Sequence, residues 1–235
     1  TNEFVDDNLK YLKEVFELND IPKRIEVYDN SHNQGSFAIG AMIVATPSGF
    51  DRKSYRTFNI KYTAETRDDF AMMQEVLKRR FEKLTPENKP DVVLLDGGRG
   101  QLNAVMESLK DFDLNGITFI AISKGPDRNA GKEFYHMQNK ESFELEYRSP
   151  LAFYLQNLRD EAHRFAIGTH RKKRAKSIFK SKLDDVDGIG AKRKKDLLNY
   201  FGSAEDVMQA NVDDLQKVSG INKKTAEKIY KYFHN

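Results

Sequence analysis

The most constraining feature of this sequence is a short continuous apolar run that ends at a carboxylate and a glycine-rich turn. Residues 91–95 read Asp-Val-Val-Leu-Leu, and Asp96-Gly97-Gly98-Arg99-Gly100 follows directly. An uninterrupted apolar run of this length is typical of a parallel strand that is buried on both faces. Such a strand needs a sheet with helices packed on both sides, so the run predicts an α/β fold.

The segments around this run predict the rest of the sheet. Alternating apolar residues over 23–29, 37–46 and 53–62 predict three strands with short connections, an antiparallel meander. Helical spacing and further apolar runs predict helices at 5–18, 67–84, after Gly100 to about 110 and from Pro150 to about 170, with a strand at 117–122 and a hairpin over 133–147. This order predicts a mixed sheet flanked by helices, since crossovers between parallel strands are right-handed.

Two aspartates end predicted strands. Asp29 follows the first strand, and Asp96 follows the apolar run. If these strands lie side by side and parallel, both carboxylates meet at the edge of the sheet where ligands gather. Paired carboxylates bind a hard divalent cation, and phosphodiester hydrolysis needs such a cation. Each aspartate alone also has a plain explanation as a turn former.

Other titratable residues are ambiguous from the residues alone. His163 flanks the buried stripe of the helix predicted from Pro150, and a lone helical histidine favours a structural role. Asp68 and Asp69 lie at the start of the helix predicted over 67–84, where carboxylates stabilise the N-terminus. Either aspartate belongs to a site only if it faces the same cleft as Asp29 and Asp96.

The charge of the chain is distributed unevenly. Residues 171–235 hold 16 of the 39 basic residues and 9 of the 36 acidic ones, a net charge of +7. The first 170 residues carry a net charge of −4. We expect a solvated basic linker over 171–182, where seven Lys/Arg occur without an acidic residue. This segregation predicts a basic C-terminal module with a polyanionic partner.

A glycine turn occurs twice in that module. Gly188-Ile189-Gly190 and Gly220-Ile221-Asn222 each precede a basic amphipathic helix. Glycine lets backbone N–H groups approach a phosphate, so tandem copies predict helix-hairpin-helix binding of the DNA backbone rather than a plain helical dimerisation unit. Asn222 stands where a second glycine is expected, and asparagine tolerates the left-handed conformation, so we expect this hairpin to form but to hold phosphate less well. The predicted DNA-binding residues are Gly188, Gly190, Lys192, Arg193, Lys194, Gly220, Asn222, Lys223 and Lys224.

Composition excludes several classes of protein. No stretch approaches the ~18 consecutive apolar residues of a membrane span, and the first helix is acidic, unlike a signal peptide. The absence of cysteine excludes disulfide frameworks, thiol nucleophiles and cysteine zinc sites. We expect a cytoplasmic protein that does not bind membranes. The chain begins at Thr1, so we also expect it to be part of something longer.

Several motifs taken together resemble a known family. They are Ile21-Pro22-Lys23-Arg24-Ile25-Glu26, Asp29-Asn30-Ser31-His32 with Gly35, Tyr55-Arg56, Asp68-Asp69, Leu95-Asp96-Gly97-Gly98-Arg99-Gly100-Gln101-Leu102 and Arg159-Asp160-Glu161-Ala162-His163-Arg164-Phe165-Ala166. With the tandem hairpins, this ordered set resembles the C-terminal half of the UvrC family, from about residue 21 onward. The resemblance implies a ribonuclease-H-like endonuclease domain over 1–170, a linker over 171–182 and a small all-α tandem helix-hairpin-helix domain over 183–235.

The resemblance also implies a function and a site. It implies a metal-dependent nuclease that makes the 5′ incision beside a lesion in double-stranded DNA, together with UvrB and, indirectly, UvrA. The catalytic and metal-binding set falls on Asp29, Asp96 and His163, with Mg²⁺ or Mn²⁺ as cofactor. An imidazole ligand favours Mn²⁺, or His163 serves instead as a general base. Asp68 is a further candidate that the motif does not separate from Asp69.

Two alternatives remain open from the sequence. One is a DNA-binding scaffold without catalysis on the same frame. The other is a structure-specific nuclease of another pathway, such as junction resolution.

Overall fold

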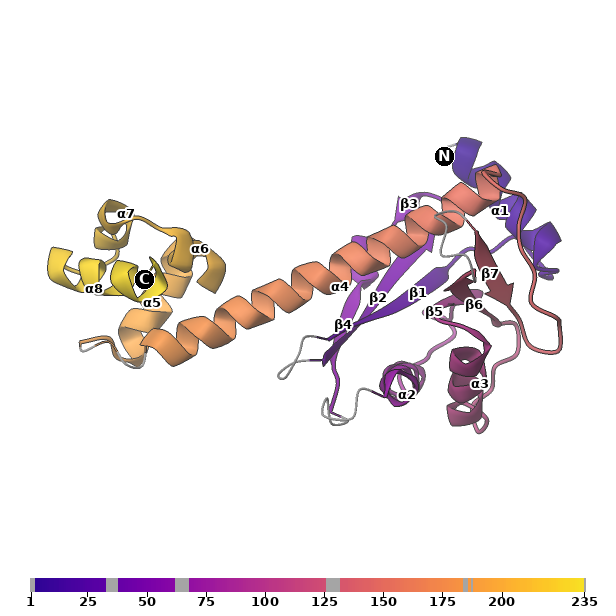
Figure 1. Ribbon diagram of the computed structural model, residues 1–235, viewed down its shortest axis with the longest axis horizontal. Helices are drawn as coiled ribbons and strands as arrows, with labels where there is room; N and C mark the ends of the chain where they lie inside the picture. The colour runs from indigo at the N-terminus through magenta and orange to yellow at the C-terminus, as the bar shows by residue number, and fades with distance from the viewer. Residues whose placement is uncertain are drawn as a thin grey trace. The chain divides into compact units, whose positions relative to one another are not determined.

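The chain forms two compact units, residues 1–167 and 168–235. The structure is a computed structural model that describes residues 3–32, 38–61, 68–125, 132–183, 186 and 188–234 (Figure 1). The helices and strands of the first unit are α1 (Glu3–Val15), β1 (Ile25–His32), β2 (Ala38–Thr46), β3 (Gly49–Phe50), η1 (Arg52–Ser54), β4 (Arg56–Asn59), α2 (Asp69–Phe81), β5 (Val92–Asp96), α3 (Arg99–Ser108), β6 (Thr118–Lys124), β7 (Glu133–His136) and the first part of α4 (Pro150–Leu183).

In the described part of the chain, seven strands form one mixed sheet in the order β3-β2-β1-β5-β6-β7, with β4 also paired to β2. β1 is antiparallel to β2, whereas β1–β5 and β5–β6 are parallel. The predicted meander that feeds parallel crossovers is therefore confirmed, as is the fold class. No helix among the described residues is long and apolar enough to cross a membrane.

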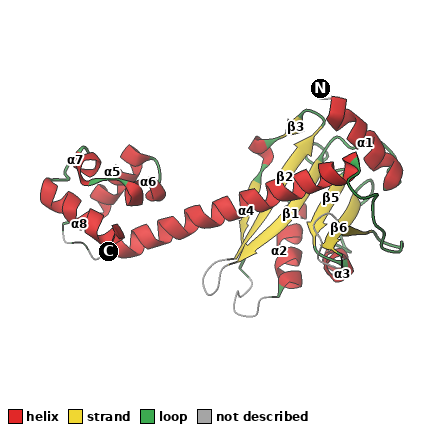
Figure 2. Cartoon of the chain, turned by 45° about the horizontal axis from the view of Figure 1, so that its top comes forward, coloured by secondary structure: helices red, strands yellow, loops and turns green. Residues whose placement is uncertain are grey.

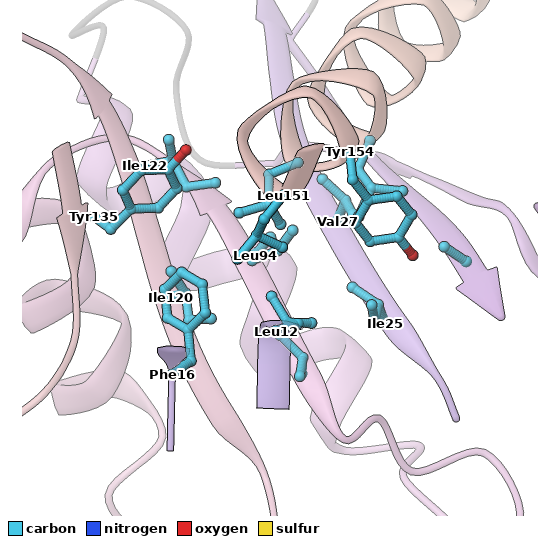
Figure 3. Packing of buried hydrophobic residues seen from close by; sticks show 14 of the residues in the cluster. Leu12, Phe16, Ile25, Val27, Leu94, Ile120, Ile122, Tyr135, Leu151 and Tyr154 are labelled. Atoms are coloured by element: carbon cyan, nitrogen blue, oxygen red, sulfur yellow. The ribbon is translucent and has the colours of Figure 1, made fainter. Parts of the chain in front are cut away.

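Helices cover both faces of the sheet, so its strands alternate between two cores. Figure 2 shows α1 and the start of α4 on one face, with α2 and α3 on the other. Ile25 and Val27 of β1 pack against the α1 and α4 side, as Figure 3 shows, whereas Tyr28 faces α2 and α3. Leu94 and Leu95 of β5 divide in the same way, which explains the continuous apolar run.

Two predicted elements are shorter than expected. Within the range 53–61 of the strand predicted over 53–62, the described strand is β4, and the one-turn helix η1 separates it from β3. At η1, Ser54 Oγ donates to Asp51 Oδ2 at 2.7 Å. Residue 62 lies outside the described residues. In the hairpin predicted over 133–147, the second arm pairs with β7 only through one isolated bridge, between Tyr135 and Phe143, whereas β7 pairs along its length with β6. Local polar turns interrupt the alternation that a longer strand would need.

The expected linker over 171–182 is helical, because α4 continues to Leu183. The segment holds no proline or glycine, and Lys, Arg and Ala are good helix formers. Phe179 and Leu183 are also buried in the core of the second unit. Charge density alone therefore predicted a linker where propensity and packing favour a helix.

The second unit is a tandem helix-hairpin-helix domain, as predicted. After α4 come α5 (Ala191–Phe201), α6 (Ala204–Gln209), α7 (Val212–Gln216) and α8 (Lys223–His234). Its core includes Ile189 and Ile221, the apolar residues of the two glycine turns. Each turn is therefore anchored by its central side chain, which leaves its backbone at the surface.

A buried charge network fixes the start of β1. The Glu26 side chain is fully buried and accepts two hydrogen bonds from Arg80 of α2, at 2.8 and 3.2 Å. Arg24 and the Tyr28 hydroxyl donate to the same carboxylate at 2.9 and 2.5 Å. Burial, and then the charge of Glu26, raise the pKa of Tyr28. The network satisfies a carboxylate that would otherwise be costly inside the core.

Removing Arg80 should therefore destabilise the first unit strongly. We expect Arg80→Met to lower the free energy of unfolding by about 3 kcal/mol, because Glu26 loses its main buried counter-charge. Urea unfolding measures the change. The control is Lys110→Met, which breaks the surface pair with Glu107 and should leave the midpoint unchanged. Equal midpoints for Arg80→Met and wild type would show that the network does not stabilise the fold.

Candidate active site

Asp29 and Asp96 come together because β1 and β5 are parallel neighbours. The last paired residues in the register are Tyr28 and Leu95, so the two aspartates occupy the next position on each strand. β5 ends at Asp96, but β1 continues to His32 because it pairs there with β2. Both aspartates line the same pocket of about 260 Å³. The predicted juxtaposition of the two carboxylates is present, although Asp29 does not end its strand.

Gly97 lets the chain leave β5 without filling the site. Its φ is +142°, a backbone conformation that side chains disfavour. A Cβ at this position would also lie 2.8 Å from the Gln101 side chain. The glycine after Asp96 is therefore required by the turn and by the close approach of α3.

α4 carries His163 to the site. His163 Nδ1 lies 3.0 Å from Asp29 Oδ2, and the side chains are 68% and 11% exposed. His163 flanks the stripe of α4 whose Leu158 and Ala162 are buried against the sheet. The ring therefore contacts a buried carboxylate while most of its surface faces solvent.

Arg159, one turn earlier on α4, binds the other carboxylate. Its Nη2 lies 3.1 Å from Asp96 Oδ1, and its Nη1 lies 3.7 Å from Glu133 Oε1. The buried Nε has no hydrogen-bond partner in the described part of the chain. In the sequence, Arg159 stands out only as part of the motif that contains His163. The i, i+4 spacing of Arg159 and His163 on one helix was the signal that could have identified it.

The negative charges of Asp29 and Asp96 lie close together and affect the pKa of Asp29. Burial raises the pKa of Asp29 above its ordinary value of 3.8, and the charge of Asp96 raises it further, whereas the hydrogen bond with His163 lowers it. Within the described ranges, no group of three or more His, Asp or Glu side chains is arranged to hold a metal ion. Asp29 and Asp96 are the two carboxylates that could hold a cation here, and the imidazole of His163 is hydrogen-bonded to Asp29.

Asp68 and Asp69 have different surroundings in the structure. Asp68 is the N-cap of α2, and its Oδ1 accepts the Ala71 N–H at 3.1 Å. Asp69 lines a second pocket, of about 270 Å³, which also contains Asp29 and Asp96. The structure thus gives Asp68 a capping contact and puts Asp69 among the residues that line the second pocket.

The two hairpins of the second unit differ in their capping. Gly188 and Gly220 take the left-handed conformation, with φ of +88° and +85°. Gly190 is the N-cap of α5 and provides no side-chain cap, whereas Asn222 Oδ1 accepts the Thr225 N–H at 2.8 Å. The second hairpin forms, as expected, but Asn222 does not use its tolerance of the left-handed conformation, because Gly220 supplies the positive φ and asparagine is a good N-cap.

The predicted basic residues follow these turns. Lys192, Lys223 and Lys224 are exposed, and Arg193 and Lys194 are partly exposed. The Arg193 guanidinium donates to the Gly188 carbonyl. The side chain of Arg193 is thus held against the first glycine turn.

Comparison with known proteins agrees with this architecture. The sequence model of the UvrC RNAse H endonuclease domain matches residues 13–167, and that of a SAM-like helix-hairpin-helix tandem matches 180–234. A relative from Maricaulis maris named UvrABC system protein C is 53% identical over 96% of this chain and 37% of its own length. One with the same name from Zymomonas mobilis is 52% identical over 97% of this chain and 35% of its own length.

A solved structure with a weaker likeness is that of Ciona intestinalis Endonuclease V in complex with a 24mer DNA. It is 16% identical, with a TM-score of 0.35, over 53% of this chain and 59% of that chain.

The protein is therefore of the class that joins an RNase H-like endonuclease domain to a tandem helix-hairpin-helix domain. The chain belongs to the UvrC family. It spans little more than a third of the length of the curated relatives that it matches.

Neutralising Asp29 should stabilise the protein in a buffer that contains a chelator of divalent cations. The pKa of Asp29 is raised in the folded state, so the ionised carboxylate costs stability once the pH exceeds both the unfolded and the folded pKa. We expect Asp29→Asn to have a higher urea midpoint than wild type at pH 7. The difference should shrink as the pH falls and vanish well below 3.8, where wild-type Asp29 is protonated in both the folded and the unfolded state.

Asp111→Asn, at an exposed position, is the control and should show no such pH-dependent gain. An Asp29→Asn variant less stable than wild type at pH 7 would show that the charge of Asp29 does not destabilise the fold.

Proposed function

We propose that this chain is a divalent-metal-dependent endodeoxyribonuclease that makes the 5′ incision next to a lesion in nucleotide excision repair. The observation that supports this best is the pair of adjacent carboxylates, Asp29 and Asp96, with His163 hydrogen-bonded to Asp29. The name of the relatives, UvrABC system protein C, supports the excision-repair setting and UvrB and UvrA as partners. The location that we propose is the cytoplasm.

The residues of the site fit a hard divalent cation. Asp29 is buried next to a second negative charge, and a cation would relieve the cost that raises its pKa. Two carboxylates suffice, because Mg²⁺ commonly keeps several waters and takes further oxygens from substrate phosphates. Asp96 is 52% exposed, so one edge of the pair stays open to such a substrate. When bound, Mg²⁺ or Mn²⁺ would polarise a phosphate oxygen and lower the pKa of a water.

The protein groups around the carboxylates have complementary roles. The ring of His163 is largely exposed and lies beside the two carboxylates, so it is suited to accept the proton of the attacking water. Lys124 and Arg159 line the same pocket and supply positive charge beside a phosphate. In-line attack on phosphorus breaks the bond to the 3′ oxygen, and leaves a 5′-phosphate and a 3′-hydroxyl.

The second unit is proposed to bind the DNA backbone. The first hairpin fits this role best, since Gly190 leaves the N–H groups of the first turn of α5 without a side-chain cap and Lys192 follows. At α8, Asn222 already occupies the Thr225 N–H. Binding of this kind recognises phosphate rather than base sequence and weakens with salt.

The catalytic assignment is tested by nicking of lesion-containing duplex DNA with Mg²⁺ or Mn²⁺. We expect Asp29→Asn to abolish nicking and keep DNA affinity, and His163→Ala to slow nicking by ~10²–10⁴-fold as for loss of a general base. Asp68→Asn is the matched control, because asparagine caps α2 as well as aspartate does. Wild-type nicking by Asp29→Asn would refute the site. Loss of nicking in Asp68→Asn would show that Asp68 does more than cap.

The same assay separates the alternative functions. Parallel reactions use an undamaged duplex and a four-way junction. A protein that binds DNA without any metal-dependent nicking would be a scaffold, and preference for the junction would indicate a nuclease of another pathway.

The hairpin assignment predicts opposite effects on stability and binding. Gly190→Asn places a capping side chain on α5, where a Cβ meets nothing within 4 Å, so the fold should be equally or slightly more stable. The same side chain occupies N–H groups that would face phosphate. We expect DNA affinity to fall several-fold and its dependence on salt to become shallower, measured by fluorescence anisotropy.

Asn222→Ala is the counterpart. It removes the cap of α8, so it should lower stability by about 1 kcal/mol with little effect on DNA affinity. Unchanged affinity and salt dependence in Gly190→Asn would refute phosphate binding by the first hairpin.

A further inference from the structure

We propose that Phe70 stacks on an unstacked nucleobase next to the scissile phosphate, so that the nuclease favours locally distorted DNA over regular duplex. The inference rests on the proposed function and adds a specificity-determining residue to it. It starts from the second pocket, which lies beside the carboxylate pair and is lined by Asp29, Asp69, Phe70, Asp96 and Gln101 among others.

The ring of Phe70 is exposed although it borders a pocket with catalytic candidates. It is 48% exposed and lies in the first turn of α2, directly after Asp69. A large apolar side chain in this place gains little from the fold itself. An aromatic face beside a phosphate-cleaving site is suited to a base, since every base has a face that can stack.

The position of Phe70 is fixed by its neighbours. A Cβ at Gly100 of α3 would lie 2.8 Å from Phe70 Cζ, so the edge of the ring lies directly against the α3 backbone. Gln101 Nε2 donates to the Asp69 carbonyl at 3.5 Å, and Gln74 Nε2 donates to the Ala104 carbonyl at 2.7 Å. These contacts join α2 to α3 and hold the ring in place, which reduces the entropy lost when a base binds.

The same pocket contains an unused amide. Both polar atoms of the Asn30 side chain are buried and lack a hydrogen-bond partner within the described ranges. Such a pair is costly unless a ligand or water satisfies it. A carboxamide offers one donor group and one acceptor, which matches the mixed polar edge of a base. Aromatic ring and amide together define a nucleotide subsite rather than a simple phosphate site.

A distorted duplex is the substrate that this subsite would select. In regular DNA each base is stacked on its neighbours, so its face is not available to Phe70. Unstacking costs least where the duplex is mismatched or damaged. The stacking contact would therefore improve binding where the helix is already disturbed.

The test compares Phe70→Leu, Phe70→Tyr and Phe70→Trp with wild type in nicking of a duplex with one unpaired nucleotide. We expect Phe70→Leu to raise KM about tenfold with little change in kcat, and the aromatic variants to stay near wild type. Phe153→Leu is the matched control, because Phe153 is 57% exposed and lies outside both site pockets. A wild-type KM in Phe70→Leu would refute the proposal.

A second measurement keeps the test independent of folding and catalysis. In the Asp29→Asn background, 2-aminopurine is placed at successive positions around the cut. When the protein binds, we expect its fluorescence to be quenched at a single position, and this quenching should require Phe70. Quenching that persists in Phe70→Leu, or that occurs at no position, would refute stacking. Nicking by Asp29→Asn itself would refute the proposed function. If Asp29→Asn does not nick but Phe70→Leu keeps the wild-type KM, the stacking proposal alone is refuted.

Discussion

The parallel pairing of β1 with β5 is the constraint on which the site depends. It places Asp29 and Asp96 at equivalent positions of neighbouring strands, so two like charges are held together by the backbone hydrogen bonds of the sheet. α4 contributes a partner for each carboxylate: His163 contacts Asp29, and Arg159 contacts Asp96. Because these two residues are one helical turn apart, a single helix sets the electrostatic balance of the site.

The sheet was predictable from sequence because its burial is regular. The apolar run before Asp96 and the alternation around Val27 reflect strands that face one or two cores, and a parallel neighbour follows from the chain order. The helix over 171–182 was not predictable from charge, since its end is fixed by Phe179 and Leu183 in a core that the sequence does not display. Local charge patterns describe solvent exposure better than they describe where a helix stops.

The site was predictable in part. Strand order brought Asp29 and Asp96 together, but residues alone left His163 without a partner, and only the resemblance to a family assigned it a role. Arg159 was missed because its function depends on which face of α4 meets the sheet edge. The identity of Asn222 indicated only that it tolerates a left-handed conformation, while its position after Gly220 makes it an N-cap.

The buried Glu26–Arg80 network explains how β1 tolerates the repulsion at its other end. A strand could relieve two facing carboxylates by slipping one residue, which would turn every side chain to the opposite face. For β1, such a slip would also carry Glu26 away from Arg80 and Tyr28 and leave buried charges unpaired. Breaking a buried ion pair costs about 3–5 kcal/mol, so the network opposes such a slip. The like charges of Asp29 and Asp96 are thus maintained by an ion pair three residues away on the same strand, and a divalent cation is the ligand best suited to neutralise them.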